Sequence, residues 1–106
     1  MSSPYCIVLT TTNLPENRDK LINEVLQQQL AACIQTLAIN SHYVWKGEVC
    51  SDDEVLLIIK TTRRCYPALE QLIVEHHVYE TPQIVQIPFK EGFNPYLAWL
   101  NENTRR

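Results

Sequence analysis

Residues 54–61 read EVLLIIKT, and this stretch decides the fold because its apolar side chains follow one another without polar ones in between. A strand with one wet face alternates apolar and polar residues, whereas a strand that is apolar on both faces is covered on both sides. We therefore expect residues 54–61 to form a central strand of a sheet whose two faces are both buried.

The residues before this strand, 33–49 (CIQTLAINSHYVWKGEV), have the pattern of one long strand. Its odd-numbered face carries the apolar residues Leu37, Ile39, Tyr43 and Trp45. Strands usually have about five or six residues, so a strand of 17 residues predicts a bulge or bend, which we place near Asn40 and Ser41. The polar run 50–54, CSDDE, is then expected to turn the chain into the central strand.

The remaining segments predict strands at 5–10 and 83–89 and helices at 16–31 and beyond residue 61. Helix-start signals are Pro15 for the first helix, Thr61 or Thr62 with Pro67 for the second, and Asn94 with Pro95 for a short helix near the C-terminus. The order β-α-β-β-α-β, followed by α, is that of the ferredoxin-like fold. This is an α+β class with one antiparallel sheet and two helices on one of its faces.

Two helices on one face leave the other face of such a sheet uncovered, although its strands are apolar on both. An uncovered apolar face normally marks an interface. We therefore expect a homo-oligomer whose sheets pack face to face, with Tyr43 and Trp45 as interface residues near the tip of the long hairpin. Long edge strands also favour pairing between subunits.

Composition limits the function further. The chain has 106 residues, which suits a single domain over 1–106, and its net charge of −3 disfavours nucleic-acid binding. No apolar run has the ~18 residues of a membrane span, and the first residues lack the features of a signal peptide, so we expect no membrane partner and a cytoplasmic protein. The four cysteines lack zinc-finger spacing and are expected to be free thiols.

The stretch HHVYETPQI, residues 76–84, contains the adjacent residues His76 and His77. Two imidazoles with a nearby carboxylate such as Glu80 fit a divalent metal. Pro82 indicates that a helix ends here, and an imidazole at a helix C-terminus is also stabilised by the helix dipole. From the residues alone, the second interpretation is favoured and the first stays open.

Tyr79 and Glu80 are also candidates to line a pocket with Lys60, although a structural role for Lys60 is favoured. Tyr43 and Trp45 fit interface anchors better than a stacking platform. Neither a GxSxG motif nor a glycine-rich phosphate loop occurs, and the chain has only two glycines, so we expect no enzymatic activity.

Six segments together resemble the CutA divalent-ion tolerance family, in the order of that family and over nearly the whole chain. They are IVLTTTN (7–13), LAACIQTL (30–37), YVWKGEV (43–49), VLLIIKTT (55–62), HHVYETPQIVQIPF (76–89) and NPYLAWLN (94–101). The resemblance implies a ferredoxin-like subunit in a tight homotrimer, a design shared with PII-type signalling proteins. It also implies a link to tolerance of copper and other divalent metals, with no enzymatic reaction attached.

The copper site proposed for the family uses a cysteine at the end of the first strand and two adjacent histidines. These positions map onto Thr10, His76 and His77. A hydroxyl is a poor ligand for a soft metal, so the resemblance implies that copper or another divalent metal is bound weakly here. The chain also departs from the family at Val78, at Ala38 with Ile39, and at Gln83.

Three hypotheses follow from the sequence. The first is a homotrimer that binds divalent metal weakly through His76 and His77. The second is a PII-like module that binds a small anion in a cleft between subunits, lined by Trp45, Lys60, Tyr79 and Glu80, and that signals to an unknown partner. The third is a non-catalytic structural assembly protein.

Overall fold

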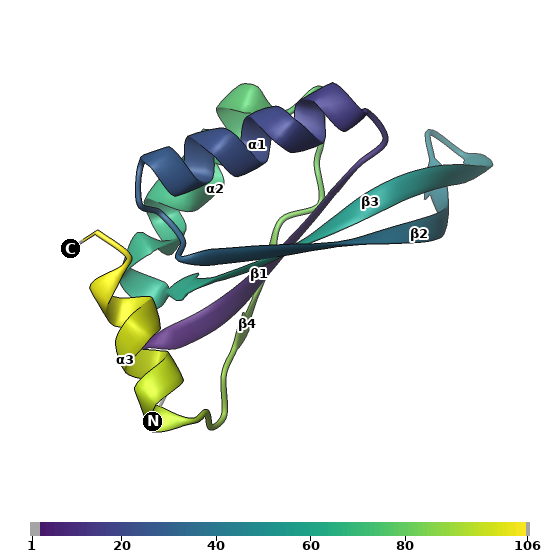
Figure 1. Cartoon of the computed structure of the whole chain (residues 1–106). Helices are drawn as coiled ribbons and strands as arrows, with labels where there is room; N and C mark the ends of the chain where they lie inside the picture. The colour runs from purple at the N-terminus through teal and green to yellow at the C-terminus, as the bar shows by residue number, and fades with distance from the viewer. Residues whose placement is uncertain (1–2, 106) are drawn as a thin grey trace.

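The computed structural model describes residues 3–105 and contains the predicted order of strands and helices (Figure 1). Its elements are β1 (Tyr5–Thr12), α1 (Pro15–Gln27), β2 (Cys33–Trp45), β3 (Glu48–Thr62), the 3₁₀ turn η1 (Arg63–Cys65), α2 (Tyr66–His76), β4 (Val85–Pro88) and α3 (Asn94–Glu102). The strands form one antiparallel sheet in the order β2-β3-β1-β4. The α+β, ferredoxin-like fold with an added C-terminal helix is therefore confirmed.

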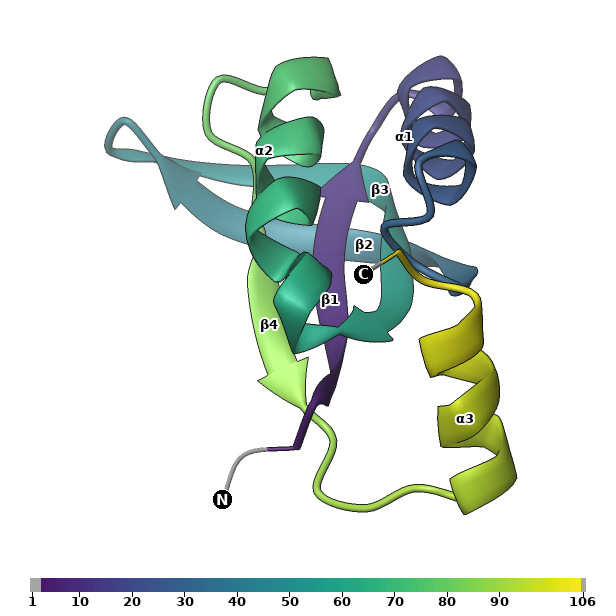
Figure 2. The same ribbon diagram turned by 90° about the vertical axis from the view of Figure 1, so that its left-hand side faces the viewer.

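Helices α1 and α2 lie side by side on one face of the sheet, and α3 lies apart from them, at the end of the sheet away from the hairpin tip (Figures 1 and 2). The core between helices and sheet includes eight side chains that are 0% exposed: Cys6, Val8, Leu21, Val25, Leu57, Ile59, Leu69 and Ile73. The apolar residues that recur every two positions in the strands and about every 3.6 positions in the helices therefore pack against each other in one layer.

Strand β3 is apolar on both faces, as its sequence predicts. Leu57 and Ile59 are buried under the helices, whereas Leu56 and Ile58 between them are only half-buried. On this second, open face, Ile58 lies opposite Leu9 of β1, and Leu56 lies opposite Leu37 of β2. The side chain of Leu37 is 56% exposed, so a single chain leaves much of this face uncovered.

The long hairpin differs from the prediction at its turn. Strand β2 ends at Trp45, and the chain reverses at Lys46 and Gly47, which have φ values of 49° and 79°. Positive φ at both central residues is the geometry of a type I′ two-residue turn, which matches the twist of the flanking strands. The run CSDDE (50–54), expected to be the turn, instead lies within β3.

The bulge expected near Asn40 and Ser41 is also absent, because one continuous register pairs every residue of β2 from Cys33 to Trp45 with β3. Asp53 is accommodated in the strand because it is exposed and accepts a hydrogen bond from Asn40 Nδ2 at 2.9 Å. The polar residues of CSDDE (50–54) therefore belong to a solvent-exposed part of a strand and not to a turn.

Two helix boundaries also differ from expectation. Helix α1 ends at Gln27 rather than at residue 31, since Gln29 adopts a φ of 57° and turns the chain so that Leu30 enters the core. Helix α2 begins at Tyr66 after η1, with Cys65 at its N-cap position, so neither Thr61 nor Thr62 caps it. The Thr61 hydroxyl instead donates to the Leu30 carbonyl at 2.6 Å. Pro67 lies in the first turn of α2, as predicted.

None of the helices within residues 3–105 is both long enough and apolar enough to cross a membrane.

Candidate functional site

The loop after α2 is held against the end of β1 by Asn17, a residue of α1 that is only 5% exposed. Its Nδ2 donates to the His76 carbonyl at 2.8 Å, and its Oδ1 accepts from the Thr12 hydroxyl at 2.9 Å and from the Val78 N–H at 3.4 Å. A buried amide with three partners fixes the positions of the elements that it joins. The loop that carries the paired histidines is therefore anchored to both α1 and β1.

Both ring nitrogens of His77 are engaged. Its Nε2 lies 2.8 Å from the Thr11 carbonyl, which can only accept, so Nε2 carries the proton and donates. Its Nδ1 is then free to accept from the Tyr79 N–H at 3.0 Å. Burial lowers the pKa of His77, although the Thr11 carbonyl and the Glu54 carboxylate act in the opposite direction. The neutral imidazole thus ties the loop to β1.

The two adjacent histidines consequently have different surroundings. His76 is half-buried at the last residue of α2, and its ring has no hydrogen-bond partner among residues 3–105. Thr10, onto which the resemblance maps a cysteine ligand, is 0% exposed, and its hydroxyl is buried without a partner among the same residues.

The described part of the chain contains no group of three or more His, Cys, Asp or Glu residues that could hold a metal ion. A coordinated imidazole needs a free nitrogen, and both nitrogens of His77 are used. The residues near His76 and His77 therefore do not fit a tightly bound metal ion within one chain.

Tyr79 connects this loop to the sheet. Its hydroxyl donates to Glu54 Oε2 of β3 at 2.6 Å, and its ring lies 4.7 Å from the His77 ring, centroid to centroid. Burial and the Glu54 carboxylate raise the pKa of Tyr79, so its hydroxyl keeps its proton and acts as a donor. No pattern in the sequence indicated that Glu54 and Tyr79, which are 25 positions apart, would form a hydrogen bond.

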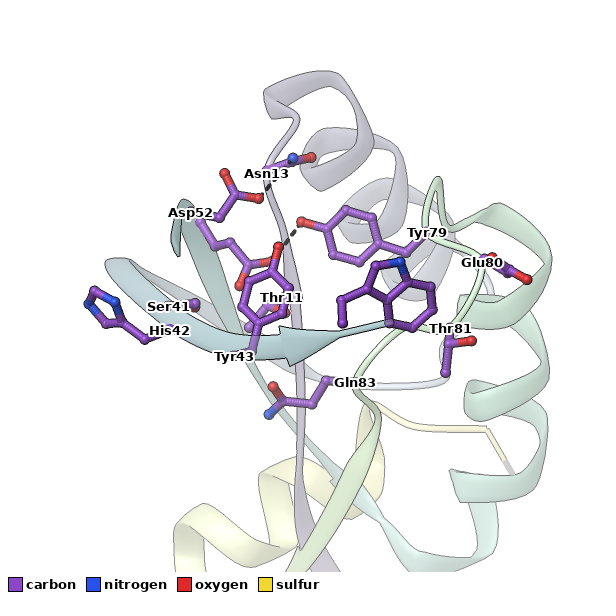
Figure 3. A pocket seen from close by; sticks show the side chains of 12 residues that line it. Thr11, Asn13, Ser41, His42, Tyr43, Asp52, Tyr79, Glu80, Thr81 and Gln83 are labelled. Carbon is purple, nitrogen blue, oxygen red and sulfur yellow. Dashed lines mark hydrogen bonds between the residues drawn. The ribbon is translucent and has the colours of Figure 1, made fainter. Parts of the chain in front are cut away.

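A cleft of 630 Å³ opens beside this pair, on the uncovered face of the sheet and near the hairpin end (Figure 3). Its lining includes Trp45, Tyr79 and Glu80, three of the four residues that were expected to line a cleft between subunits, and the cleft between subunits itself stays a prediction. Lys60 is not among them, because its Nζ lies 5.9 Å from the centroid of the Tyr96 ring of α3.

The cleft also contains residues that the sequence analysis did not single out as a binding site. Tyr43 was expected only at an interface, and Asp52 and Glu54 were assigned to a turn and a strand start, respectively. The missed signal is the alternation of positions 52 and 54 on one face of a strand, which places both carboxylates on the side where Tyr43 and Trp45 lie.

Comparison with known proteins identifies relatives over nearly the whole chain. A family model described as "CutA1 divalent ion tolerance protein" matches residues 6–103. The divalent-cation tolerance protein CutA of Thermus thermophilus is 38% identical over 99 residues, which are 92% of this chain and 96% of that protein.

A plant relative and a solved structure agree with this match. The chloroplastic protein CutA of Arabidopsis thaliana is 38% identical over 103 residues, which are 96% of this chain but only 57% of the plant protein. The crystal structure of CutA1 from Oryza sativa superposes with a TM-score of 0.92 at 35% identity and covers 98% of this chain and 96% of that one.

Proposed function

Because the chain belongs to the CutA1 divalent ion tolerance protein family, we propose that it contributes to divalent-metal tolerance as a homotrimer that binds copper or another divalent ion weakly. The observation that carries the proposal is the pair His76 and His77 at the end of α2, of which His76 has an unengaged ring. We propose a binding role for the chain and no catalytic role. We also propose that it acts in the cytoplasm, where the free cysteines of the described residues would stay reduced.

The two histidines have different proposed roles. His76 is the direct ligand, since its imidazole is available to an ion. His77 holds the loop, because binding an ion at either of its nitrogens would break a hydrogen bond to Thr11 or to Tyr79. With one available imidazole and a hydroxyl instead of a thiolate at Thr10, affinity for a soft metal is low.

The proposed trimer is supported by the open face of the sheet. Leu37, Val85 and Ile87 on this face are 56%, 43% and 47% exposed in the single chain. Isolated exposed apolar residues are ordinary, but a contiguous apolar face marks an interface. Packing of this face against other copies would cover β3 on both sides, as its sequence requires.

The role of His76 is tested by calorimetric titration of the assembled protein with Cu(II) and Zn(II). His76→Ala is expected to weaken binding by about tenfold or more, since a ligand contributes at least as much as the residues that orient ligands. His77→Ala is expected to have a smaller effect on binding and to reduce thermal stability. His42→Ala is the matched control, because His42 is an exposed imidazole on β2.

Unchanged affinity in His76→Ala, or equal losses in His76→Ala and His42→Ala, would remove His76 from the proposal. The tolerance role is tested separately by growth of a deletion strain under copper stress. Rescue by the wild-type chain and failure of His76→Ala to rescue are expected.

The alternative of a small-anion site has less support. Within one chain Lys60 lies against α3, and the residues that line the cleft include Asp52, Glu54 and Glu80 but no Lys or Arg, so an anion site there would need a cation from another subunit. Carboxylates repel an anion and disfavour its binding.

A further inference from the structure

Helix α2 ends at His76 without the residue type that usually ends a helix. Helices commonly end in a glycine or asparagine with positive φ. Here His77 follows with φ −79° and ψ 143°, and Val78 has no positive φ either. The last carbonyls of a helix also lack partners within it. The His76 carbonyl finds its partner in another helix, because Asn17 Nδ2 of α1 donates to it at 2.8 Å.

The amide of Asn17 contacts the backbone on both sides of His77. Its Nδ2 donates to the carbonyl of His76, and its Oδ1 accepts from the N–H of Val78 at 3.4 Å. A carbonyl can only accept and an N–H can only donate, so both contacts require the same orientation of the amide. One side chain of α1 therefore holds the backbone where α2 ends and the loop begins.

Thr12 of β1 fixes the same amide from the other side. Its hydroxyl donates to Asn17 Oδ1 at 2.9 Å and accepts from the N–H of Leu14 at 3.4 Å, just before α1 begins. Thr12 is 0% exposed and Asn17 is 5% exposed. Asparagine is a poor helix former. Its place in the first turn of α1 is therefore explained by these contacts and not by helix propensity.

These contacts are internal to one chain. The side chain of Thr12 lies on the helix-facing side of β1, because it alternates with Thr11 and shares a face with Val8 and Thr10. Asn17 reaches from α1 to the end of α2 on the same side of the sheet. The open face, where other copies are proposed to pack, is the opposite one. The Asn17 amide therefore has the same partners in the single chain and in the proposed assembly.

We propose that Asn17 is a positioning residue that gives the two adjacent histidines their different roles. By ending α2 at His76, it lets residue 77 leave the helix. The His77 ring then reaches the Thr11 carbonyl at 2.8 Å and accepts from the Tyr79 N–H at 3.0 Å, while His76 stays on the helix. The consequence for ion binding at His76 rests on the proposed function, whereas the placement of the His77 ring does not.

The first test observes the His77 ring without metal. Its Nε2–H proton is seen by NMR only while a hydrogen bond slows its exchange with water, and the Thr11 carbonyl supplies that bond in the assembled wild-type protein. Asn17→Ala is expected to speed this exchange about fivefold or more, the scale of one lost hydrogen bond. The measurement is made at about pH 8, where a histidine of ordinary pKa is neutral.

Variants of two buried threonines show whether the effect is specific. Thr12→Val removes the donor to Asn17 and is expected to act in the same direction as Asn17→Ala, whereas Thr12→Ser keeps the hydroxyl and is expected to resemble wild type. Thr61→Val is the matched control, since its equally buried hydroxyl donates to the Leu30 carbonyl and not to the histidine loop. It is expected to lower thermal stability without changing the His77 ring proton.

The second test titrates the same variants with Cu(II) by calorimetry. Asn17→Ala is expected to weaken Cu(II) binding about tenfold, because residues that orient a ligand contribute on this scale. Thr61→Val is expected to bind Cu(II) as wild type does. Unchanged Cu(II) affinity in Asn17→Ala would overturn the link between Asn17 and ion binding.

Two further results would overturn the proposal. One is a His77 ring proton that exchanges in Asn17→Ala as slowly as in wild type. The other is an equal effect of Asn17→Ala and Thr61→Val on that proton, which indicates a general loosening of the fold. If Asn17→Ala does not fold, the comparison of Thr12→Val with Thr12→Ser decides. If wild type binds no Cu(II), the proposed function fails, and the ring proton still decides whether Asn17 places His77.

Discussion

Thr10 shows what one residue changes in this protein. Its side chain is completely buried on the helix-facing side of β1, and its hydroxyl finds no partner within residues 3–105. A buried polar group without a hydrogen bond costs about 1–3 kcal/mol. Where the CutA family resemblance implies a thiolate ligand, this chain holds a hydroxyl that is unfavourable for stability and poor for copper.

Thr10→Val is expected to raise the free energy of unfolding by about 1 kcal/mol, because valine has nearly the same shape and leaves no unpaired hydroxyl. The measurement is urea denaturation at neutral pH. Thr61→Val is the control, since the Thr61 hydroxyl is equally buried but donates to the Leu30 carbonyl, and it is expected to be destabilising. A Thr10→Val protein less stable than wild type would contradict the expectation.

Cys6 makes the stability of the fold depend on pH. Burial raises the pKa of the Cys6 thiol from 9.0 to about 11, against a lowering effect of Arg63. Between pH 9 and pH 11 the Cys6 thiol therefore keeps its proton in the folded chain and loses it in the unfolded chain. The stability that the buried, protonated thiol contributes is fully present below pH 9 and is lost as the pH rises towards 11.

Between these two pH values, wild type is expected to lose about 2 kcal/mol more stability than Cys6→Ala, which has no thiol at this position. Urea denaturation at pH 8, 9, 10 and 11, under reducing conditions, measures the difference. Parallel pH profiles of the two proteins would show that Cys6 does not titrate in this way.

At the scale of elements, the hairpin of β2 and β3 shows how local signals can mislead. CSDDE has the composition of a turn, yet it continues a strand because its residues lie beyond the helices and their side chains reach solvent. The actual turn, Lys46-Gly47, has only one turn-forming residue. The continuous pairing of β2 with β3 determines the position of the turn more strongly than the composition of CSDDE does.

Gly47→Ala is expected to destabilise the protein by about 1 kcal/mol, because the φ of Gly47 is 79° and alanine is strained there. No atom lies within 4 Å of the added methyl group, so the effect is one of backbone conformation alone. Lys46→Asn is the matched change, since asparagine tolerates the positive φ of position 46, and it is expected to be neutral or slightly stabilising. Thermal unfolding compares the three proteins; an unaffected Gly47→Ala would refute the turn geometry.

The candidate cleft was predictable in part. The sequence analysis grouped Trp45, Tyr79 and Glu80, and these residues do line one cavity. Lys60 was grouped with them, but it shares a strand face with Glu54 at six residues' distance, about 20 Å along β3. This distance places Lys60 away from the cleft within one chain, and the cleft expected between subunits stays a prediction.

At the scale of the whole molecule, the hairpin extends the chain to 44 × 27 × 22 Å and leaves one face of the sheet open. Both α1 and α2 are on the other face (Figure 2). The long hairpin and the open face have a common explanation if other copies of the chain pack against them, as we propose for the trimer.

Leu37→Glu is expected to weaken this assembly by several kcal/mol, because it would place a charge in an apolar interface. Val74→Glu is a closely matched control: Val74 is also 56% exposed, but it lies on α2, on the helix side of the molecule. Sedimentation equilibrium at decreasing concentration is expected to show dissociation of Leu37→Glu alone. Equal masses for both variants and wild type would show that the open face is not the interface.

The sequence by itself determined the order of strands and helices and the two-faced character of β3, because periodicity is a local property that each segment carries alone. Only the tertiary structure decided the turn at Lys46-Gly47, the hydrogen bonds that occupy both nitrogens of His77, and the meeting of Glu54 with Tyr79. These features depend on the register of strands and on contacts between residues far apart in the chain, which no local pattern encodes.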